Sequence, residues 1–252
     1  MSDFPTKEWL QLYEEKKEFL AAYNDFNEYF SAQEIAGKKL FKLSMGNVNF
    51  PTGKVLVCDP LVYLNRDEEP YFIQTPIGNF PIETLVVEVE EEHYRYVAVR
   101  IKFNGKKAVS HFEALKGDED LKDLGEGEYF GFNVDAGLAT IVDVATRDAY
   151  SDFSDRWDAE TEDENKNIYD DFFAAEFEKS YHQNPEFQRE GGDWINFQIP
   201  GTELSVPMIQ SGFGDGVYPV YFGFDENNEV CELVVQFIDI ELAFEDDEED
   251  EE

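Results

Sequence analysis

Three aspartates stand beside turn-forming residues: Asp59 precedes a proline, Asp135 opens an Asp-Ala-Gly turn, and Asp215 lies between two glycines. A fold that brings these carboxylates together would offer oxygen ligands to a divalent cation, or an acid and a base if their pKa values were split. Alternatively, each carboxylate accepts hydrogen bonds from the backbone N–H groups of a turn, as Asp side chains commonly do. The turn role is the simpler interpretation, so we treat these three residues as ligand-binding candidates and assign no catalytic residue.

The other residues that could do chemistry form no familiar motif. The two cysteines are 173 positions apart and no two histidines are closely spaced, which argues against a zinc site. The sequence also has no GxSxG nucleophile turn and no phosphate-binding loop that leads into a helix. We therefore expect no metal and no cofactor, and we lean away from an enzyme. Cys58 and Cys231 each lie in an apolar run, which predicts buried, reduced thiols.

The charge balance carries most of the functional information. The chain has 57 Asp and Glu residues against 20 Lys and Arg residues, a net charge of −37. A surface that binds nucleic acid needs a surplus of cations, so we expect no direct binding to nucleic acid. A strongly anionic field instead accelerates association with basic proteins.

An acidic insertion at about residues 151–179 is expected to begin with an exposed loop. The partner-binding candidates are the acids of that loop: Asp152, Asp155, Asp158, Glu160, Glu162, Asp163 and Glu164. These features predict a non-catalytic acidic binding protein of immunity or antitoxin type, which would cover the cationic site of a basic toxin such as a nuclease. Two alternatives stay open. The charge could serve solubility alone, or the protein could be an enzyme, small-ligand binder or divalent-cation binder that uses the three turn aspartates.

The apolar content shows that the chain folds despite its charge. Hydrophobic residues make up 42% of the chain and aromatic residues 15%, well above a disordered acidic chain. Between Pro5 and Ile35 the aromatic residues recur at spacings of three, four and seven, which predicts one helix or two short helices. Asp3 or Thr6 could cap the start, and Asn24-Asp25 could interrupt the middle. This aromatic stripe either packs on the rest of the protein or docks a partner.

Beyond residue 46, β-branched and aromatic residues alternate, which predicts strands. The predicted strands cover residues 54–58, 85–89, 94–103, 129–134, 139–144, 194–199, 218–223 and 230–240. We expect 129–134 to pair with 139–144 across the Asp135 turn. Residues 112–121 are ambiguous and could hold a short helix, and residues 168–177 have the spacing of an amphipathic helix.

These elements predict an α+β fold with a mainly antiparallel β-sheet core. An N-terminal aromatic helical segment, residues 1–45, would pack on a β-rich core domain, residues 46–244, that carries the acidic insertion. Residues 245–252 are eight consecutive acids and are expected to form a disordered tail. No run of 18 apolar residues and no signal-peptide pattern is present, so we expect a cytoplasmic protein without membrane contact.

Four stretches resemble a bacterial family known as the domain of unknown function 4241 family. They are GKVLVCDPL at residues 53–61, PIGNFPI at 76–82, FGFNVDAG at 130–137 and SGFGDGVYPVY at 211–221, followed by a terminal hairpin. The resemblance covers about residues 46–240. The family commonly has an Asp directly before the last strand Phe, where this chain has Gln236. What the resemblance implies is a shared fold and no particular activity, so function must be argued from the residues.

Overall fold

The computed structural model describes residues 5–161 and 165–244 and shows an α+β fold with antiparallel sheets, which confirms the expected fold class. The helical elements are α1 (Lys7–Lys16), η1 (Lys17–Leu20), α2 (Phe26–Tyr29), α3 (Val144–Glu160), η2 (Tyr169–Phe173), α4 (Ala174–Gln183) and α5 (Ile240–Phe244). The strands are β1 (Glu34–Ile35), β2 (Lys38–Phe50), β3 (Val55–Cys58), β4 (Gly78–Glu90), β5 (His93–Lys102), β6 (Ser110–Glu113), β7 (Phe132–Val134), β8 (Leu138–Asp143), β9 (Trp194–Gln198), β10 (Ser205–Gln210), β11 (Gly216–Tyr218), β12 (Val220–Phe224) and β13 (Val230–Gln236).

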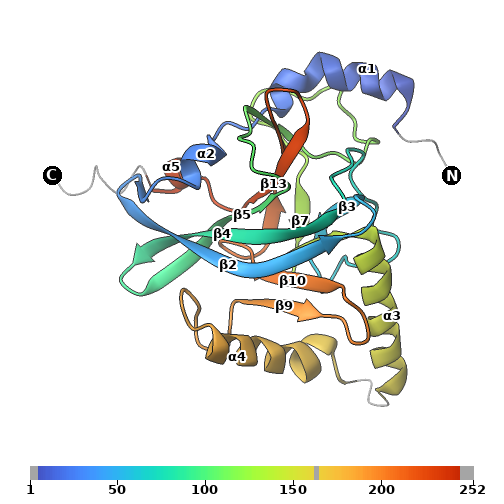
Figure 1. Cartoon of the computed structure of the whole chain (residues 1–252), viewed down its shortest axis with the longest axis vertical. Helices are drawn as coiled ribbons and strands as arrows, with labels where there is room; N and C mark the ends of the chain where they lie inside the picture. Colours follow the sequence, from blue (N-terminus) through green and yellow to red (C-terminus); the bar gives the residue numbers. More distant parts are fainter. Residues whose placement is uncertain (1–4, 162–164, 245–252) are drawn as a thin grey trace.

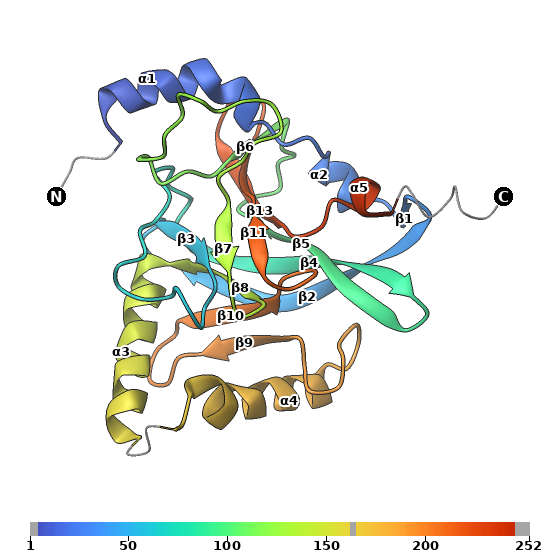
Figure 2. The same ribbon diagram turned by 180° about the vertical axis from the view of Figure 1, so that it is seen from behind.

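Within these residues the strands form two sheets and a short ribbon. A large sheet in the order β1-β2-β4-β5-β13-β12-β6 curls into a half-barrel (Figure 1). A small sheet in the order β3-β8-β10-β9 lies beside it, and β7 pairs with β11 as the ribbon. Helix α3 runs along one side of the small sheet and α4 lies beyond β9, whereas α1 lies at the opposite end of the molecule (Figure 1, Figure 2).

The main core lies where the two sheets face each other. Strands β5, β12 and β13 are buried along most of their length, as expected for strands that are covered on both faces. Phe222 of the large sheet and Ile141 of the small sheet belong to the same buried cluster. The outer face of the large sheet is covered by α2, where the Phe26 ring lies 5.1 Å from His111 and 5.3 Å from Tyr221.

The N-terminal aromatic stripe packs on the rest of the chain. Trp9 and Tyr13 of α1 stack at 5.5 Å and share a buried cluster with leucines of the 114–125 loop. Thr6 caps α1, because its hydroxyl accepts the N–H of Trp9 at 3.1 Å. The large sheet starts before the expected boundary at residue 46, since β2 already begins at Lys38.

The expected pairing across the Asp135 turn does not occur. Strands β7 and β8 form on either side of the turn, but β7 pairs with β11, and β8 lies between β3 and β10. The reason is that the turn gives three of its N–H groups to carboxylates from other segments: Asp135 and Ala136 donate to Asp59, and Gly137 donates to Asp215. These donors are therefore not used to close a hairpin.

The ambiguous segment 112–121 contains no helix. Its first residues complete β6 and pair with β12, so their backbone groups are used by the sheet. Beyond the strand, the side chain of Glu119 accepts the N–H groups of Lys116 at 2.5 Å and Gly117 at 2.9 Å, which fixes a turn. Gly117 adopts a φ of +102°, a conformation that helical residues do not have.

The acidic loop expected from residue 152 is mostly helical, which corrects that prediction. Helix α3 continues to Glu160 because Tyr150 and Phe153 form a buried face with helical spacing, while the acids fall on the other face. Glu162, Asp163 and Glu164 lie outside the described residues, as does the predicted tail at 245–252. The amphipathic helix expected at 168–177 corresponds to η2 and the start of α4.

Both cysteines are buried and free, as the sequence predicts. Burial raises the pKa of the Cys58 thiol well above its ordinary value and raises the pKa of Cys231 to about 11. The thiolate is the reactive form of cysteine, so these two thiols act as small apolar core groups near neutral pH.

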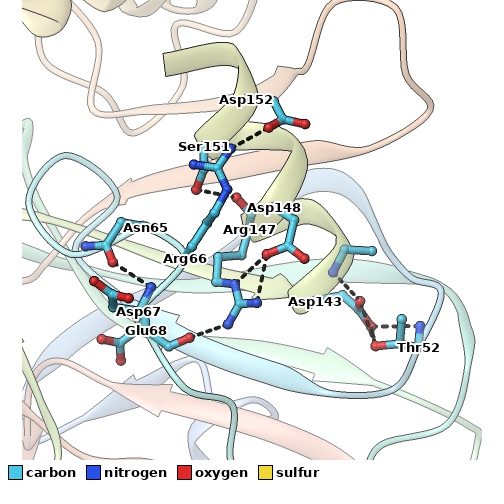
Figure 3. A network of polar contacts seen from close by, with 11 residues as sticks. Thr52, Asn65, Arg66, Asp67, Glu68, Asp143, Arg147, Asp148, Ser151 and Asp152 are labelled. Atoms are coloured by element: carbon cyan, nitrogen blue, oxygen red, sulfur yellow. Dashed lines mark hydrogen bonds and ion pairs between the residues drawn. The ribbon is translucent and has the colours of Figure 1, made fainter. Parts of the chain in front are cut away.

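Asp143 joins α3 to the turn that follows β2 (Figure 3). Its carboxylate is fully buried and caps α3 by accepting the N–H of Ala145 at 2.9 Å. The same carboxylate accepts the backbone N–H groups of Thr52 and Gly53, each at 2.9 Å. One side chain therefore satisfies three backbone donors from two distant segments of the chain.

Replacing Asp143 by alanine tests this junction. Asp143→Ala leaves three backbone N–H groups without their acceptor, so we expect it to lower the free energy of unfolding by about 3 kcal/mol or more. Urea denaturation followed by circular dichroism measures this change. The matched control is Asp158→Ala, which removes an exposed Asp from the same helix and should change stability by less than about 0.5 kcal/mol. Equal effects of the two substitutions would contradict the junction role.

Candidate functional site

The structure brings Asp59, Asp135 and Asp215 to one turn. Asp59 Oδ2 accepts the N–H of Asp135 at 3.1 Å and the N–H of Ala136 at 2.6 Å, and Asp59 Oδ1 accepts the N–H of Leu61 at 3.0 Å. Asp215 Oδ1 accepts the N–H of Gly137 at 3.1 Å. The three aspartates therefore join the segment after β3, the β7–β8 turn and the segment before β11.

The chemistry of this aspartate cluster is that of turn stabilisation. Asp59 is fully buried, and its burial raises the pKa of its carboxyl, while the backbone donors at Leu61, Ala136 and Asp135 lower it. Asp135 is exposed, and its carboxylate accepts the hydroxyl of Tyr63. Across residues 5–161 and 165–244, no three His, Cys, Asp or Glu side chains are grouped so that they could hold a metal ion. The arrangement favours the turn role over a cation site.

The partner-binding candidates that the structure describes lie on α3. Asp152, Asp155, Asp158 and Glu160 are exposed on this helix. Asp148, Asp152 and Asp155 follow one another at spacings of four and three residues, so they share one strip of the helix surface. The opposite face of α3 is anchored in the core by Tyr150 and Phe153.

Arginines hold part of this strip in place (Figure 3). Arg66, from the loop after β3, forms ion pairs with Asp152 and, at 2.8 Å, with Asp155. Arg147 donates to Asp148 at 2.7 Å and to the carbonyl oxygen of Glu68 at 2.6 Å. The first carboxylates of the strip therefore already have cationic partners.

The C-terminal end of α3 is different. Asp158 and Glu160 form no ion pair within the described part of the chain, and the last turn of the helix has no basic residue. Negative charge at a helix C-terminus is unfavourable, because it lies at the negative end of the helix dipole. These two carboxylates are therefore free to accept a cation, and a cation placed there would relieve an unfavourable interaction.

Sequence reasoning missed a cavity on the outer face of the large sheet. It has a volume of about 280 Å³ and lies between η1, the 127–129 loop, β12 and the segment that follows β13. Aromatic rings of Phe19, Tyr23, Tyr129 and Tyr221 line it, together with the carboxyl group of Glu113. Glu113 is the last residue of β6 and is only 2% exposed.

Glu113 has an unusual environment for a carboxyl group. Its Oε1 accepts the N–H groups of Phe130 and Gly131, each at 2.7 Å. Burial raises the pKa of Glu113 to about 7, the nearby charge of Glu119 also raises it, and the two backbone donors oppose this shift. A buried acid that changes its protonation state near neutral pH marks a candidate functional residue.

The comparison with known protein families gives one match. Residues 48–235 match the family described as "Protein of unknown function (DUF4241)". The chain belongs to this family. No curated protein and no solved structure matches the chain. Membership in the DUF4241 family therefore shows that the chain shares this domain, and it assigns no activity.

Some of the residues that line the cavity lie inside the region that matches the DUF4241 family, and others lie outside it. Glu113, Tyr129 and Tyr221 lie inside the matched region, whereas the wall formed by η1 and residues 21–24 lies before it. Gln236 also lines the cavity, just beyond the match, and its Nε2 donates to Asn24 at 2.8 Å. The residue type at this position thus bears on how the N-terminal segment closes over the DUF4241 domain.

One sequence signal could have drawn attention to Glu113. It is a single acid inside the apolar stretch Phe112 to Leu115, next to a segment whose structure was ambiguous. Such an acid is buried only when the fold supplies partners for it. The cavity itself could not be foreseen, because its walls come from four segments that are far apart in the sequence.

A pair of substitutions tests the structural role of the aspartate cluster. Asp59→Ala removes a buried acceptor of three backbone N–H groups, so we expect it to lower the free energy of unfolding by about 3 kcal/mol. Asp215→Ala removes one exposed hydrogen bond and should lower it by less than about 1 kcal/mol. Urea unfolding of the two variants and the wild type measures the difference. Comparable losses in both variants would show that Asp59 does not hold the turn.

Proposed function

We propose that this protein is a non-catalytic acidic binding protein of the cytoplasm that neutralises a basic protein partner, in the manner of an immunity protein or antitoxin. The observation that supports this most directly is the exposed carboxylate array of α3, whose C-terminal end carries Asp158 and Glu160 without cationic partners among the described residues. The partner would present lysine or arginine side chains, as the cationic site of a nuclease toxin does. Within the described residues, no helix is long and apolar enough to cross a membrane.

The proposed interaction follows from charge and rigidity. A net charge of −37 attracts a basic protein over a distance of about a Debye length and accelerates its encounter. The α3 array then selects an orientation, because the helix is anchored by Tyr150 and Phe153 and its first carboxylates are held by Arg66. Charges that are fixed before binding lose little conformational freedom when the partner arrives.

The alternative function, an enzyme or a cation binder that uses Asp59, Asp135 and Asp215, lacks a comparable observation. The oxygens of Asp59 accept three backbone donors, and Asp215 accepts one. The hydroxyl that the cluster holds is that of Tyr63, and its hydrogen bond to Asp135 raises the pKa of Tyr63, so this group stays protonated near neutral pH. The binding function is therefore the one that we carry forward.

Affinity capture tests the proposal. The immobilised wild-type protein is incubated with the cytosol of its native cell in a series of rising salt concentrations, and retained proteins are identified by mass spectrometry. We expect one basic protein whose retention falls steeply with salt, because the encounter is electrostatic. Retention of no basic protein at low salt, or retention that does not change with salt, would contradict the proposal.

A charge-neutral variant of α3 locates the surface. Asp155→Asn, Asp158→Asn and Glu160→Gln together should weaken binding of the captured protein about tenfold or more. The same variant should unfold at slightly higher urea concentration, since it removes negative charge from a helix C-terminus, so lost binding cannot be attributed to unfolding. The matched control is Glu8→Gln, Glu14→Gln and Glu18→Gln, which makes the same charge change at the opposite end of the molecule (Figure 1). Equal weakening by both variants would show that α3 is not the contact surface.

A further inference from the structure

The cavity on the outer face of the large sheet combines aromatic rings with negative charge. Its lining includes six tyrosine and phenylalanine residues and three carboxyl groups, which belong to Glu113, Glu128 and Asp239. None of the described residues that line it is a lysine, arginine or histidine. The faces of aromatic rings and the carboxylates both attract cations, so the composition of this cavity favours a positively charged ligand over a neutral or anionic one.

Most polar groups around the cavity already have partners. Asn24 donates to Asp239 at 3.2 Å and accepts from Gln236 at 2.8 Å. Glu128 accepts the N–H of Gly125 at 2.9 Å. These contacts hold the walls of the cavity. They do not involve Oε2 of Glu113, whose partner is still to be identified.

Glu113 supplies the independent observation that points to a ligand. The residue is 98% buried and lines the cavity, yet only its Oε1 is used, by the N–H groups of Phe130 and Gly131. No residue in the described part of the chain donates a hydrogen bond to its Oε2. Oε2 is not among the fully buried oxygens without a partner, so it is the part of this side chain that is open to the cavity, where a ligand with N–H groups can donate to it.

We propose that this cavity binds the protonated amino group of an alkylamine. The ammonium group donates a hydrogen bond to Oε2 of Glu113, and the alkyl chain packs among the rings of Tyr129 and Tyr221. A volume of about 280 Å³ suits a short alkyl chain, since it lies at the lower end of the range for small-molecule sites. This site is separate from the α3 surface, so the proposal stands or falls independently of the proposed function.

The protonation of Glu113 makes binding depend on pH. With its pKa raised to about 7 by burial, Glu113 is partly protonated near neutral pH. The amine stays protonated over this range, and it binds the ionised carboxylate, so a fall in pH weakens binding. Among the described residues, the titratable groups that interact with Glu113 are Glu119, Tyr71 and, on β12, Tyr221, and the cavity lining adds Tyr23, Glu128, Tyr129, Tyr218 and Asp239.

Calorimetric titration of the full chain with n-butylamine hydrochloride tests the proposal. We expect saturable binding of n-butylamine and none of n-butanol, which has the same alkyl chain without the charge. A second titration with N-acetyl-lysine amide distinguishes the sources of the amino group: binding of this compound shows that the lysine side chain of a protein can enter, and binding of n-butylamine alone assigns the site to a free amine. No saturable binding of either amine, or equal binding of n-butanol, would overturn the proposal.

Two variants locate the binding to the cavity. Glu113→Gln keeps an acceptor for Phe130 and Gly131 but removes the charge, so it should weaken n-butylamine binding about tenfold or more. Tyr129→Ala removes a ring that is 50% exposed, which leaves the core intact, and should weaken binding about threefold to tenfold. The control, Tyr169→Ala, removes another exposed ring, on η2, and should bind like the wild type. If Glu113→Gln and Tyr129→Ala both bound n-butylamine like the wild type, the proposal would be overturned. Because there are two variants, one of them can fail to fold and the other still gives the test.

The pH profile gives a third readout. Apparent affinity for n-butylamine should be about tenfold lower at about pH 6 than at about pH 8, as a carboxyl group with a pKa near 7 becomes protonated. In Glu113→Gln this dependence should disappear. A wild-type affinity that does not change over this range would exclude Glu113 as the group that binds the amine.

Discussion

Buried carboxylates that accept backbone N–H groups are the interaction on which the rest of this structure depends. Asp59, Asp143 and Glu113 each accept two backbone donors from a segment distant in the sequence, and Asp59 and Asp143 also accept a third from two residues further along the chain. Long irregular connections carry donors that no strand or helix satisfies, and a buried donor without an acceptor is strongly destabilising. This chain uses a few of its many acids as acceptors at those points. These hydrogen bonds tie the connections to one another and to the ends of the strands and helices.

Carboxylates have opposite effects on stability in the interior of this protein and on the surface of α3. Inside the fold, a carboxylate is stabilised by backbone donors and closes a junction, as Asp143 does between α3 and the turn after β2. On the surface of α3, carboxylates repel one another and two of them lie at the unfavourable end of a helix. Because these surface acids lower stability and have no structural role, they are the residues to which we assign the proposed binding role. The buried acids stabilise the fold, and the exposed acids of α3 are the ones that we propose contact the partner.

The sequence predicted the parts of this structure that depend on local pattern. The alternation from residue 54 onward predicted strands, and the contexts of Asp59, Asp135 and Asp215 predicted aspartates in turns, which is where the structure places them. The predicted loop was wrong over residues 152–160, because the density of acids obscured the helical spacing of Tyr150 and Phe153. The predicted pairing of β7 with β8 was wrong because the turn between them donates hydrogen bonds to Asp59 and Asp215. These two carboxylates lie far from the turn in the sequence. Glu113 and its cavity depend on contacts between four separate segments, which no local pattern encodes.

Hydrogen exchange of the complex with the captured basic protein tests the central claim most directly, because it reports which backbone amides the partner covers. We predict that binding slows exchange in α3, residues 144–160, and leaves exchange in α1 and at the Asp59 cluster unchanged. Slowed exchange at the Asp59 cluster or at α1 with no change in α3 would contradict it.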